Sequence, residues 1–503
     1  MSALSLLKRS KLSAHQRYVA TQLEKDLSQA QTYQEWKNTA LELDRITGRE
    51  AWKFENQSSY YDYELIGQRY ARITRLQKNP DQQLALAQYL REGLSFDIGN
   101  IAHPLLFTHT FVGTKKIIED YIDSVCQAFE YVASDAFTAF NLDEKVTYFQ
   151  GASSAYGQPA MMLSGGATLG LFHSGVCKAL FEQDLLPKVF SGASSGALVA
   201  GMMATHDDEQ LIDLLNGDGF YEYAFKFRDV VNIIKDRGGI ADIHALKNFL
   251  RKNLGEYTFA EATACSQRKV SIVVAPYSVE RQPQIMNEIT APDLLIWSAC
   301  LASCAVPFMF PAVKLTTKRA DGEYTPYMSG VRWVDGSVRS DFPQDKMAKL
   351  YNINYSIASQ VNPHIVPFMQ SDAQRYRKNF LSWPSRLLRH QSRGAALEAM
   401  DFARTHLDSM PFAQRLLDHG YGIIGQRYYG DINIVGDYSL RHYGYMLQNP
   451  TLPLFKRLQR EGERATWPRL SNIEIHARIG KTLERCLNQL LAEQQYVSMI
   501  LNS

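Results

Sequence analysis

Residues 158–205 read QPAMMLSGGATLGLFHSGVCKALFEQDLLPKVFSGASSGALVAGMMAT, and they predict two consecutive strand–turn–helix units. The apolar runs 159–163 and 188–191 each end in a glycine-containing turn, and the helical stretches 171–183 and 195–205 follow these turns. Strands that alternate with helices in this way are typical of parallel sheets. We therefore expect an α/β protein with a mainly parallel sheet in its core.

The second turn, Gly192-Ala-Ser194-Ser-Gly196, matches the nucleophile-elbow pattern Gly-x-Ser-x-Gly. The pattern alone is weak evidence, because a chain with 31 glycines in 503 residues matches it by chance with odds of roughly one in ten. A turn this tight has room only for hydrogen at its flanking glycines, and it presents the serine above a helix N-terminus that favours negative charge. Ser194 rather than Ser195 is the candidate nucleophile, since it alone has glycine at both two-residue offsets. The alternative is a glycine-rich turn that only packs.

The first turn, residues 164–170 with the sequence SGGATLG, is a candidate loop of backbone N–H donors. It lacks the Gly-Lys-Ser/Thr of a P-loop, and Ala167 breaks the dinucleotide-binding pattern Gly-x-Gly-x-x-Gly. A right-handed crossover places both turns at the carboxyl edge of neighbouring parallel strands. The loop is therefore expected where an oxyanion above Ser194 would need donors. A generic phosphate-binding loop and a plain turn are the alternatives.

A third motif, Arg332-Trp-Val-Asp335-Gly336-Ser337, places an aspartate at the end of an alternating strand. Asp335 is a candidate general base, because a carboxylate close to a serine hydroxyl can accept its proton. An Asp-Gly turn without a further role is the alternative, and it is the commoner meaning of that dipeptide.

These three motifs, in this order within one α/β region, resemble the patatin-like phospholipase family. The resemblance covers about residues 158–365, and the N-terminal helical extension looks like the triacylglycerol-lipase branch. It implies a patatin-like three-layer core with helical N- and C-terminal regions. By resemblance, Ser194 is the nucleophile, Asp335 is the base, and the other motif residues are Gly165, Gly166 and Ala167 of the oxyanion loop together with Gly170, Gly192, Gly196, Gly336 and Ser337.

The sequence departs from the patatin pattern at three positions in these motifs. Ala167 stands where glycine is usual, Leu169 stands where many members carry Arg or Lys, and Ser337 stands where Gly or Ala is usual. The change at Leu169 puts a cationic contribution from the loop in doubt, whereas it leaves the backbone donors in place.

The resemblance implies a serine acylhydrolase that cleaves fatty-acyl esters of glycerolipids through a Ser-Asp dyad and an acyl-enzyme. Triacylglycerol lipase and phospholipase A are the favoured activities; a lipid transacylase and a catalytically silent lipid-binding scaffold are the alternatives. A Ser-His-Asp triad would need a histidine after Asp335, and the chain offers His364, His390, His406, His419, His442 and His476.

The composition of the chain indicates which classes of partner and which cellular compartment to expect. The chain has 54 Lys+Arg against 52 Asp+Glu, so its net charge of +2 argues against nucleic-acid binding by overall charge. Its six cysteines are scattered and are interpreted as small buried side chains in a reducing compartment. We expect no cofactor, no metal and no signal peptide. An intracellular location with at most peripheral contact to a membrane or lipid droplet follows, and the oligomeric state is left open.

Changes in composition and in the predicted secondary structure along the sequence divide the chain into four parts. Residues 1–150 are predicted to be a helical extension, 151–367 the catalytic core, 368–430 a basic linker or lid-like segment, and 431–503 a strand followed by helix that packs on the core.

The basic segment combines arginines with aromatic and apolar residues. Arg386 and Arg389 follow Trp383 and Pro384 and flank Leu387 and Leu388, and no acidic residue lies between residues 373 and 397. Such a stretch is predicted to contact an anionic lipid surface. The alternative is a basic face that docks on the N-terminal helices.

Overall fold

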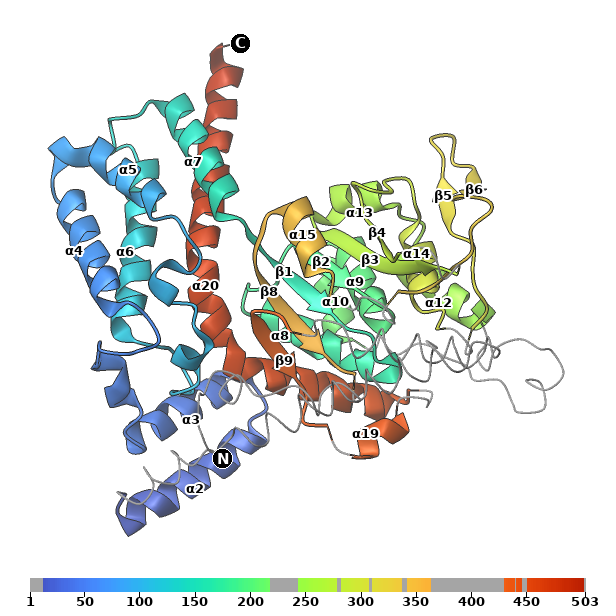
Figure 1. Cartoon of the computed structure of the whole chain (residues 1–503), viewed down its shortest axis with the longest axis horizontal. Coiled ribbons are helices and arrows are strands. Elements are labelled where there is room, and N and C mark those ends of the chain that lie inside the picture. Colours follow the sequence, from blue (N-terminus) through green and yellow to red (C-terminus); the bar gives the residue numbers. More distant parts are fainter. Residues whose placement is uncertain are drawn as a thin grey trace, which may run out of the picture.

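The computed structural model describes residues 12–217, 243–277, 282–306, 310–336, 342–362, 429–438, 440–445 and 450–501 (Figure 1). Within them the chain forms a helical N-terminal region and a sheet-containing core, and a long C-terminal helix contacts both. Several predicted sites lie outside the described residues, namely Ser337, His364, His390, His406, His419 and the basic segment with Trp383, Arg386 and Arg389.

The N-terminal region consists of helices whose ends are set by local side chains. A capping box starts α2 at Ser13 and another starts α7 at Asn141, where the side chain of the N-cap residue accepts a backbone N–H and the third helical residue returns the bond. The described helices are α2 (Ala14–Gln29), α3 (Tyr33–Ile46), α4 (Tyr63–Gln77), α5 (Gln83–Glu92), α6 (Lys116–Ala133) and α7 (Leu142–Tyr156), with the short 3₁₀ turns η1 (Glu50–Phe54), η2 (Pro80–Gln82), η3 (Ile98–Asn100) and η4 (Pro104–Phe107).

The main sheet has seven strands in the described part of the chain. They are β1 (Gln158–Leu163), β2 (Val189–Gly192), β3 (Lys269–Pro276), β4 (Gln284–Met286), β7 (Trp333–Asp335), β8 (Ile353–Gln360) and β9 (Ile432–Val435). The neighbours β3, β2, β1, β8 and β9 run parallel in that order, while β4 and β7 pair antiparallel with β3. The predicted mainly parallel sheet is therefore confirmed. A separate hairpin joins β5 (Thr316–Lys318) to β6 (Tyr324–Pro326).

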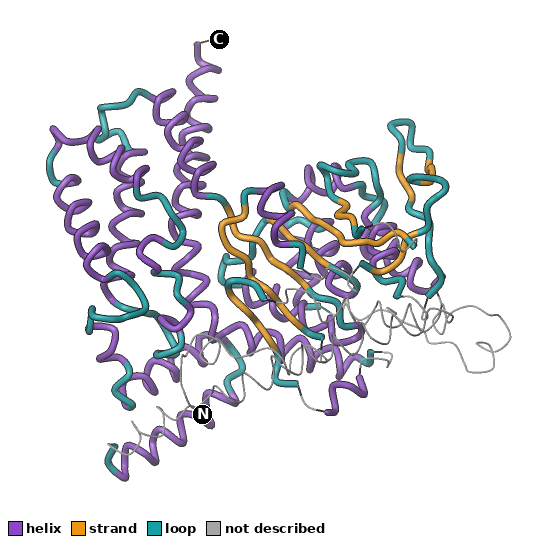
Figure 2. The backbone as a smooth tube through the Cα atoms, viewed as in Figure 1, coloured by secondary structure: helices purple, strands orange, loops and turns teal. Residues whose placement is uncertain are grey.

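Helices cover both faces of the sheet, as Figure 2 shows in purple around the orange strands. Met161 and Leu163 of β1 point into the core cluster that contains α8, α9 and α14, whereas Ala160 and Met162 point to the opposite cluster under α15. This alternation is the two-residue period of a strand buried on both faces. The core therefore has the predicted three layers.

The helices of the core lie between its strands in the chain, except α19, which follows β9. They are α8 (Phe172–Phe181), α9 (Ser195–Thr205), α10 (Asp208–Asn216), α12 (Ile243–Leu254), α13 (Phe259–Ser266), α14 (Ile296–Ser303), α15 (Gln344–Tyr351) and α19 (Leu440–Tyr445), with the 3₁₀ turn η5 (Ala167–Leu171) before α8. None of the helices in the described ranges is long and apolar enough to span a bilayer.

The C-terminal helix α20 (Leu452–Leu501) belongs to two hydrophobic cores. Its first part, from Phe455 to Ile473, packs in the sheet core, and its second part, from Ile475 to Leu490, packs among the N-terminal helices. Pro468 lies within the first part, near its end; an interior proline removes a helical hydrogen bond and kinks a helix, and Figure 1 shows α20 changing direction along its length. The apolar residues Ile475, Ile479, Leu483 and Leu490 of α20 thus face the N-terminal helices. The four domain boundaries drawn from the sequence stay predictions.

Helices α8 and α20 cross with their backbones in contact. A Cβ atom at Gly175 of α8 would overlap the carbonyl oxygen of Gln459, and one at Gly462 of α20 would overlap the carbonyl oxygen of Phe172. Only glycine fits at either position. Because α8 begins directly after η5, the crossing also fixes where the predicted donor loop ends.

We predict that Gly175→Ala lowers the free energy of unfolding by about 1–3 kcal/mol, because the backbones must separate to admit a methyl group. Gly67→Ala is the matched control: Gly67 also lies inside a helix, but its Cβ would meet no atom within 4 Å. That variant should gain roughly 0.5–1 kcal/mol from helix propensity. Urea unfolding measures both, and a Gly175→Ala protein as stable as the wild type would contradict the close crossing.

Candidate active site

Ser194 occupies a strained turn between β2 and α9. Its φ and ψ are 52° and −122°, a conformation that side-chain-bearing residues rarely adopt and that costs roughly 1–3 kcal/mol. A Cβ at Gly192 would overlap the carbonyl oxygen of Gly196, and one at Gly196 would overlap the carbonyl oxygen of Leu163. The two flanking positions therefore admit only hydrogen, as the elbow pattern requires. The helix N-terminus that follows favours negative charge near the Ser194 hydroxyl.

The glycine loop lies against this turn. Strands β1 and β2 are parallel neighbours with Leu163 opposite Gly192, and the N–H of Ala193 donates to the carbonyl oxygen of Leu163 at 3.2 Å. Both turns therefore leave the sheet at the same edge. At the far end of the loop, a Cβ at Gly170 would overlap the side chain of Ser195. Loop and elbow are thus in direct contact.

The two unusual residues of the loop have different consequences. Ala167 has a φ of 51°, a left-handed conformation that costs a residue with a Cβ roughly 1–2 kcal/mol. This conformation explains why glycine suits the position. Leu169 is fully buried in the core, so the position that carries Arg or Lys in many patatin-like sequences contributes packing here and no cation.

Asp335 comes to the same edge of the sheet from a distant part of the chain. It ends β7, pairs with Val274 of β3, and is only 1% exposed. Its N–H donates to the carbonyl oxygen of Ala305 at 3.1 Å. A Cβ at Gly336 would lie 2.8 Å from the carbonyl oxygen of Val273, so the Asp-Gly turn is pressed onto the strand next to the elbow.

Cys304 lies close to both candidate catalytic residues. Its thiol donates to the carbonyl oxygen of Ser194 at 3.3 Å. Burial raises the pKa of this thiol well above its usual value, and the charges of Cys300 and Asp335 raise it further. The N–H of Asp335 donates to the carbonyl oxygen of Ala305, the residue after Cys304, so Asp335 also lies near the backbone that contacts Ser194. The fold thus brings Ser194 and Asp335 into one neighbourhood.

Ser303 is a site residue that the sequence reasoning missed. The N–H of Ser194 donates to Ser303 Oγ at 2.9 Å, and the Ser303 hydroxyl donates to the carbonyl oxygen of Val273 at 2.7 Å. Ser303 therefore joins the elbow to the strand that holds the Asp-Gly turn. Because the N–H of Ser194 is bonded to Ser303, an oxyanion above Ser194 would have to accept hydrogen bonds from neighbouring peptide groups instead. Ser303 is one of two serines in the apolar helix α14, and no sequence pattern marks it for this role.

The two described histidines that follow Asp335 have other neighbours. His442 lies 3.2 Å from a carboxylate oxygen of Glu461 and packs edge-on against the ring of Tyr438. His476 packs on Phe96 and Phe107 in the junction with the N-terminal helices, where burial lowers its pKa to about 3. The remaining histidines of the triad hypothesis lie outside the described residues.

The sequence predicts that all six cysteines are buried, and four of them are. Cys177, Cys300, Cys304 and Cys486 are buried, but Cys126 is only partly buried and Cys265 is exposed. The prediction of buried cysteines is wrong for Cys265, which lies at the end of α13 on the rim of a surface pocket. In the described part of the chain, no three His, Cys, Asp or Glu residues are grouped as metal ligands.

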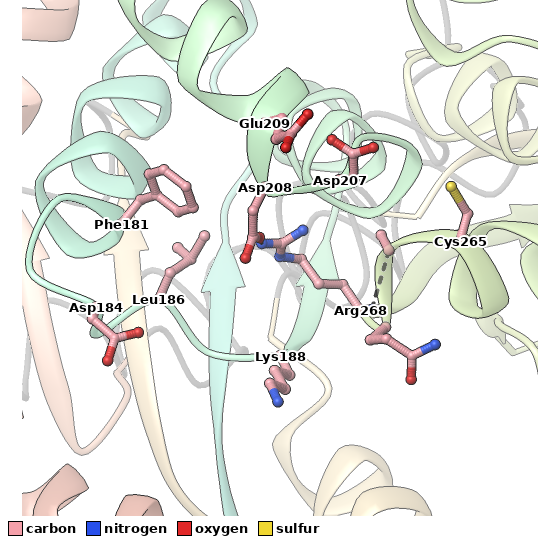
Figure 3. Close-up of a pocket in the computed structure, with 11 residues that line it drawn as sticks. Phe181, Asp184, Leu186, Lys188, Asp207, Asp208, Glu209, Cys265 and Arg268 are labelled. Atoms are coloured by element: carbon pink, nitrogen blue, oxygen red, sulfur yellow. Dashed lines mark hydrogen bonds and ion pairs between the residues drawn. The ribbon is translucent and has the colours of Figure 1, made fainter.

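The pocket beside Cys265 has a volume of about 690 Å³ and lies away from the candidate site (Figure 3). Its wall includes Lys188 and Arg268, which precede β2 and β3, so it opens at the amino edge of the sheet. Figure 3 shows Arg268 reaching toward Asp208, with which it forms an ion pair. Ser194 follows the opposite, carboxyl end of β2. This pocket and Ser194 therefore lie at opposite edges of the sheet.

Two family models match this chain, one over the N-terminal helices and one over the sheet-containing core. Residues 13–154 match a family model described as a domain of unknown function, DUF3336, and residues 161–347 match one described as patatin-like phospholipase. The chain is 31% identical over 486 residues to a triacylglycerol lipase of Schizosaccharomyces pombe, an alignment that covers 94% of this chain and 97% of that protein.

Two further relatives are longer than this chain. A triacylglycerol lipase of Saccharomyces cerevisiae is 33% identical over 485 residues, covering 92% of this chain and 52% of that protein. A patatin-like phospholipase domain-containing protein of Cryptococcus neoformans is 33% identical over 476 residues, covering 92% and 54%. The chain spans about half the length of these two relatives.

We predict that Ser303→Ala slows acylation of Ser194 at least tenfold, because the elbow loses the hydroxyl that holds its N–H. Ser298→Ala is the matched control: Ser298 is equally buried in the same helix, and its Oγ accepts the N–H of Thr316 instead. Each variant removes the hydroxyl that accepts an N–H, buried at Ser194 and partly buried at Thr316, so each should lose about 1–3 kcal/mol of stability. Labelling rates with a fluorophosphonate separate them, and equal rates for both variants would contradict the role of Ser303.

Proposed function

The chain belongs to the patatin-like phospholipase family, and on that premise we propose that it is a serine acylhydrolase that cleaves fatty-acyl esters of glycerolipids. The observation that carries the proposal is the strained Ser194 elbow pressed against the glycine loop, with the buried Asp335 at the same sheet edge. Relatives named triacylglycerol lipase favour triacylglycerol as the substrate over phospholipid.

In the proposed acylation step, Ser194 Oγ attacks the ester carbonyl carbon and its proton passes to the Asp335 carboxylate. The tetrahedral intermediate then collapses, the bond to the alcohol oxygen breaks, and Asp335 returns the proton to that oxygen. Water attacks the acyl-enzyme in the same manner and releases the fatty acid. A carboxylate can serve as this base without histidine, because a site sheltered from water weakens its solvation and raises its basicity.

Charge that develops on the carbonyl oxygen needs backbone donors. We assign this role to the peptide groups of Gly165, Gly166 and Ala167, because the loop contacts the elbow and the N–H of Ser194 is already bonded to Ser303. Donors of this kind act on charge that exists only in the transition state, so they raise turnover more than binding. An intracellular location and contact with a lipid surface complete the proposal, the latter through the basic segment around Trp383.

We predict that wild-type protein releases fatty acid from emulsified trioleoylglycerol and that Ser194→Ala does not. A fluorophosphonate should label the wild type and Ser195→Ala, but not Ser194→Ala, because only the Ser194 hydroxyl stands at the elbow. A parallel assay with dioleoylphosphatidylcholine ranks the two substrate classes, and added lysolipid reports acyl transfer. Labelling that is lost only in Ser195→Ala would overturn the nucleophile assignment.

Asp335→Asn keeps the shape of the side chain and removes the proton acceptor. We predict that its turnover falls by roughly 10²–10⁴-fold, the usual range for a lost general base, while the protein stays folded. Turnover of a soluble p-nitrophenyl ester and a thermal unfolding curve measure the two quantities. If His364→Ala caused an equal loss with the fold intact, a Ser-His-Asp triad would replace the dyad.

A further inference from the structure

His173 lies in the first turn of α8, is fully buried, and bridges two strands of the sheet. Its Nε2 is 2.9 Å from the carbonyl oxygen of Ser164, which follows β1, and its Nδ1 is 2.7 Å from Ser359 Oγ on β8. A carbonyl oxygen only accepts, so Nε2 carries the hydrogen. Burial lowers the pKa of His173 to about 4, so the ring is neutral near pH 7 and Nδ1 accepts the hydroxyl of Ser359.

The first of these bonds fixes a peptide group of the glycine loop. The carbonyl oxygen of Ser164 and the N–H of Gly165 belong to one planar trans peptide and point in opposite directions. Because His173 holds the oxygen on its own side, the N–H of Gly165 is directed to the other side. A loop without this bond would be free to rotate that peptide group.

The next peptide group is fixed in the same way. The hydroxyl of Ser164 donates to the carbonyl oxygen of Gly165 at 3.0 Å, so the N–H of Gly166 points away from Ser164 Oγ. Ser164 Oγ also accepts the N–H of Val361 at 2.9 Å, and the N–H of Ser164 donates to the carbonyl oxygen of Ser359 at 3.1 Å. Two consecutive N–H directions are therefore set through their carbonyls.

We propose that His173 is a positioning residue that, with Ser164, orients the N–H groups of Gly165 and Gly166 for the oxyanion formed above Ser194. This inference rests on the proposed acylhydrolase function. It assigns to His173 no contact with the substrate and no proton transfer, and it accounts for a buried, neutral histidine that the Ser-Asp chemistry does not use.

Hydrolysis of p-nitrophenyl butyrate by the full chain tests the proposal. His173→Phe keeps a ring of similar size and removes the donor, and its kcat should fall about 100-fold, the usual loss for one oxyanion-hole donor, while KM changes less than threefold. His173→Gln offers an amide N–H to Ser164 and an oxygen to Ser359. Its kcat should therefore be at least tenfold higher than that of His173→Phe. A residue needed only for packing would not be rescued by a smaller polar side chain.

Ser164→Ala tests the same assignment without changing the ring, which keeps the test decisive if His173→Phe does not fold. Its kcat should fall at least tenfold with KM unchanged. The matched control is Ser174→Ala, because Ser174 is also fully buried in α8 but its hydroxyl donates to the carbonyl oxygen of Leu171. Ser174→Ala should keep the wild-type kcat.

The outcomes separate this inference from the function on which it rests. Wild-type protein without turnover, or Ser194→Ala with wild-type turnover, would overturn the proposed function and this inference together. An active wild type beside folded His173→Phe or Ser164→Ala with unchanged kcat would overturn only the role of His173. A loss of kcat/KM in these variants that came entirely from a higher KM would also overturn the role of His173.

Discussion

The architecture of the site depends on backbone groups that approach one another more closely than any Cβ would allow. Gly196 lies against the carbonyl oxygen of Leu163, Gly170 against Ser195, and Gly175 against Gln459. These contacts form a continuous path from the elbow through the glycine loop and α8 to α20. Each removes a degree of freedom from the loop, which matters because oxyanion donors act only when they are already in place.

Three polar side chains, one of them distant in sequence, complete this arrangement by forming hydrogen bonds with polar backbone groups. Ser303 of α14 binds the N–H of Ser194, and His173 and Ser164 bind the carbonyls of the loop. A buried amide or carbonyl left without a partner costs about 1–3 kcal/mol, so each of these bonds is required for stability as well as for orientation. The same bonds thereby select one conformation of the elbow and the loop.

The sequence was sufficient to predict features that are local in the chain. The βα units, the glycine positions of the elbow and the end of a strand at Asp335 all follow from short patterns, because strand, turn and helix signals act over a few residues. Ser303 and His173 could not be predicted, since their roles arise only when α14 and α8 pack onto β2 and β1. Cys265 shows the converse: a residue type that is usually buried lies exposed at a helix end, and no local pattern marks the exception.

The N-terminal helices are connected to the site through α20, and apolar burial rather than charge holds that connection. Arg478, Lys481 and Arg485 of α20 pair with Asp123, Asp184 and Glu130, but these side chains are at least one-third exposed, and such pairs contribute roughly 0–1 kcal/mol each. Ile475, Ile479 and Leu483 are buried in the same junction, and burying one such side chain stabilises by about 1.5–3 kcal/mol. Because the preceding part of the same helix presses on α8 at Gly175, the packing that anchors the helical region also sets the position of the helix that carries His173.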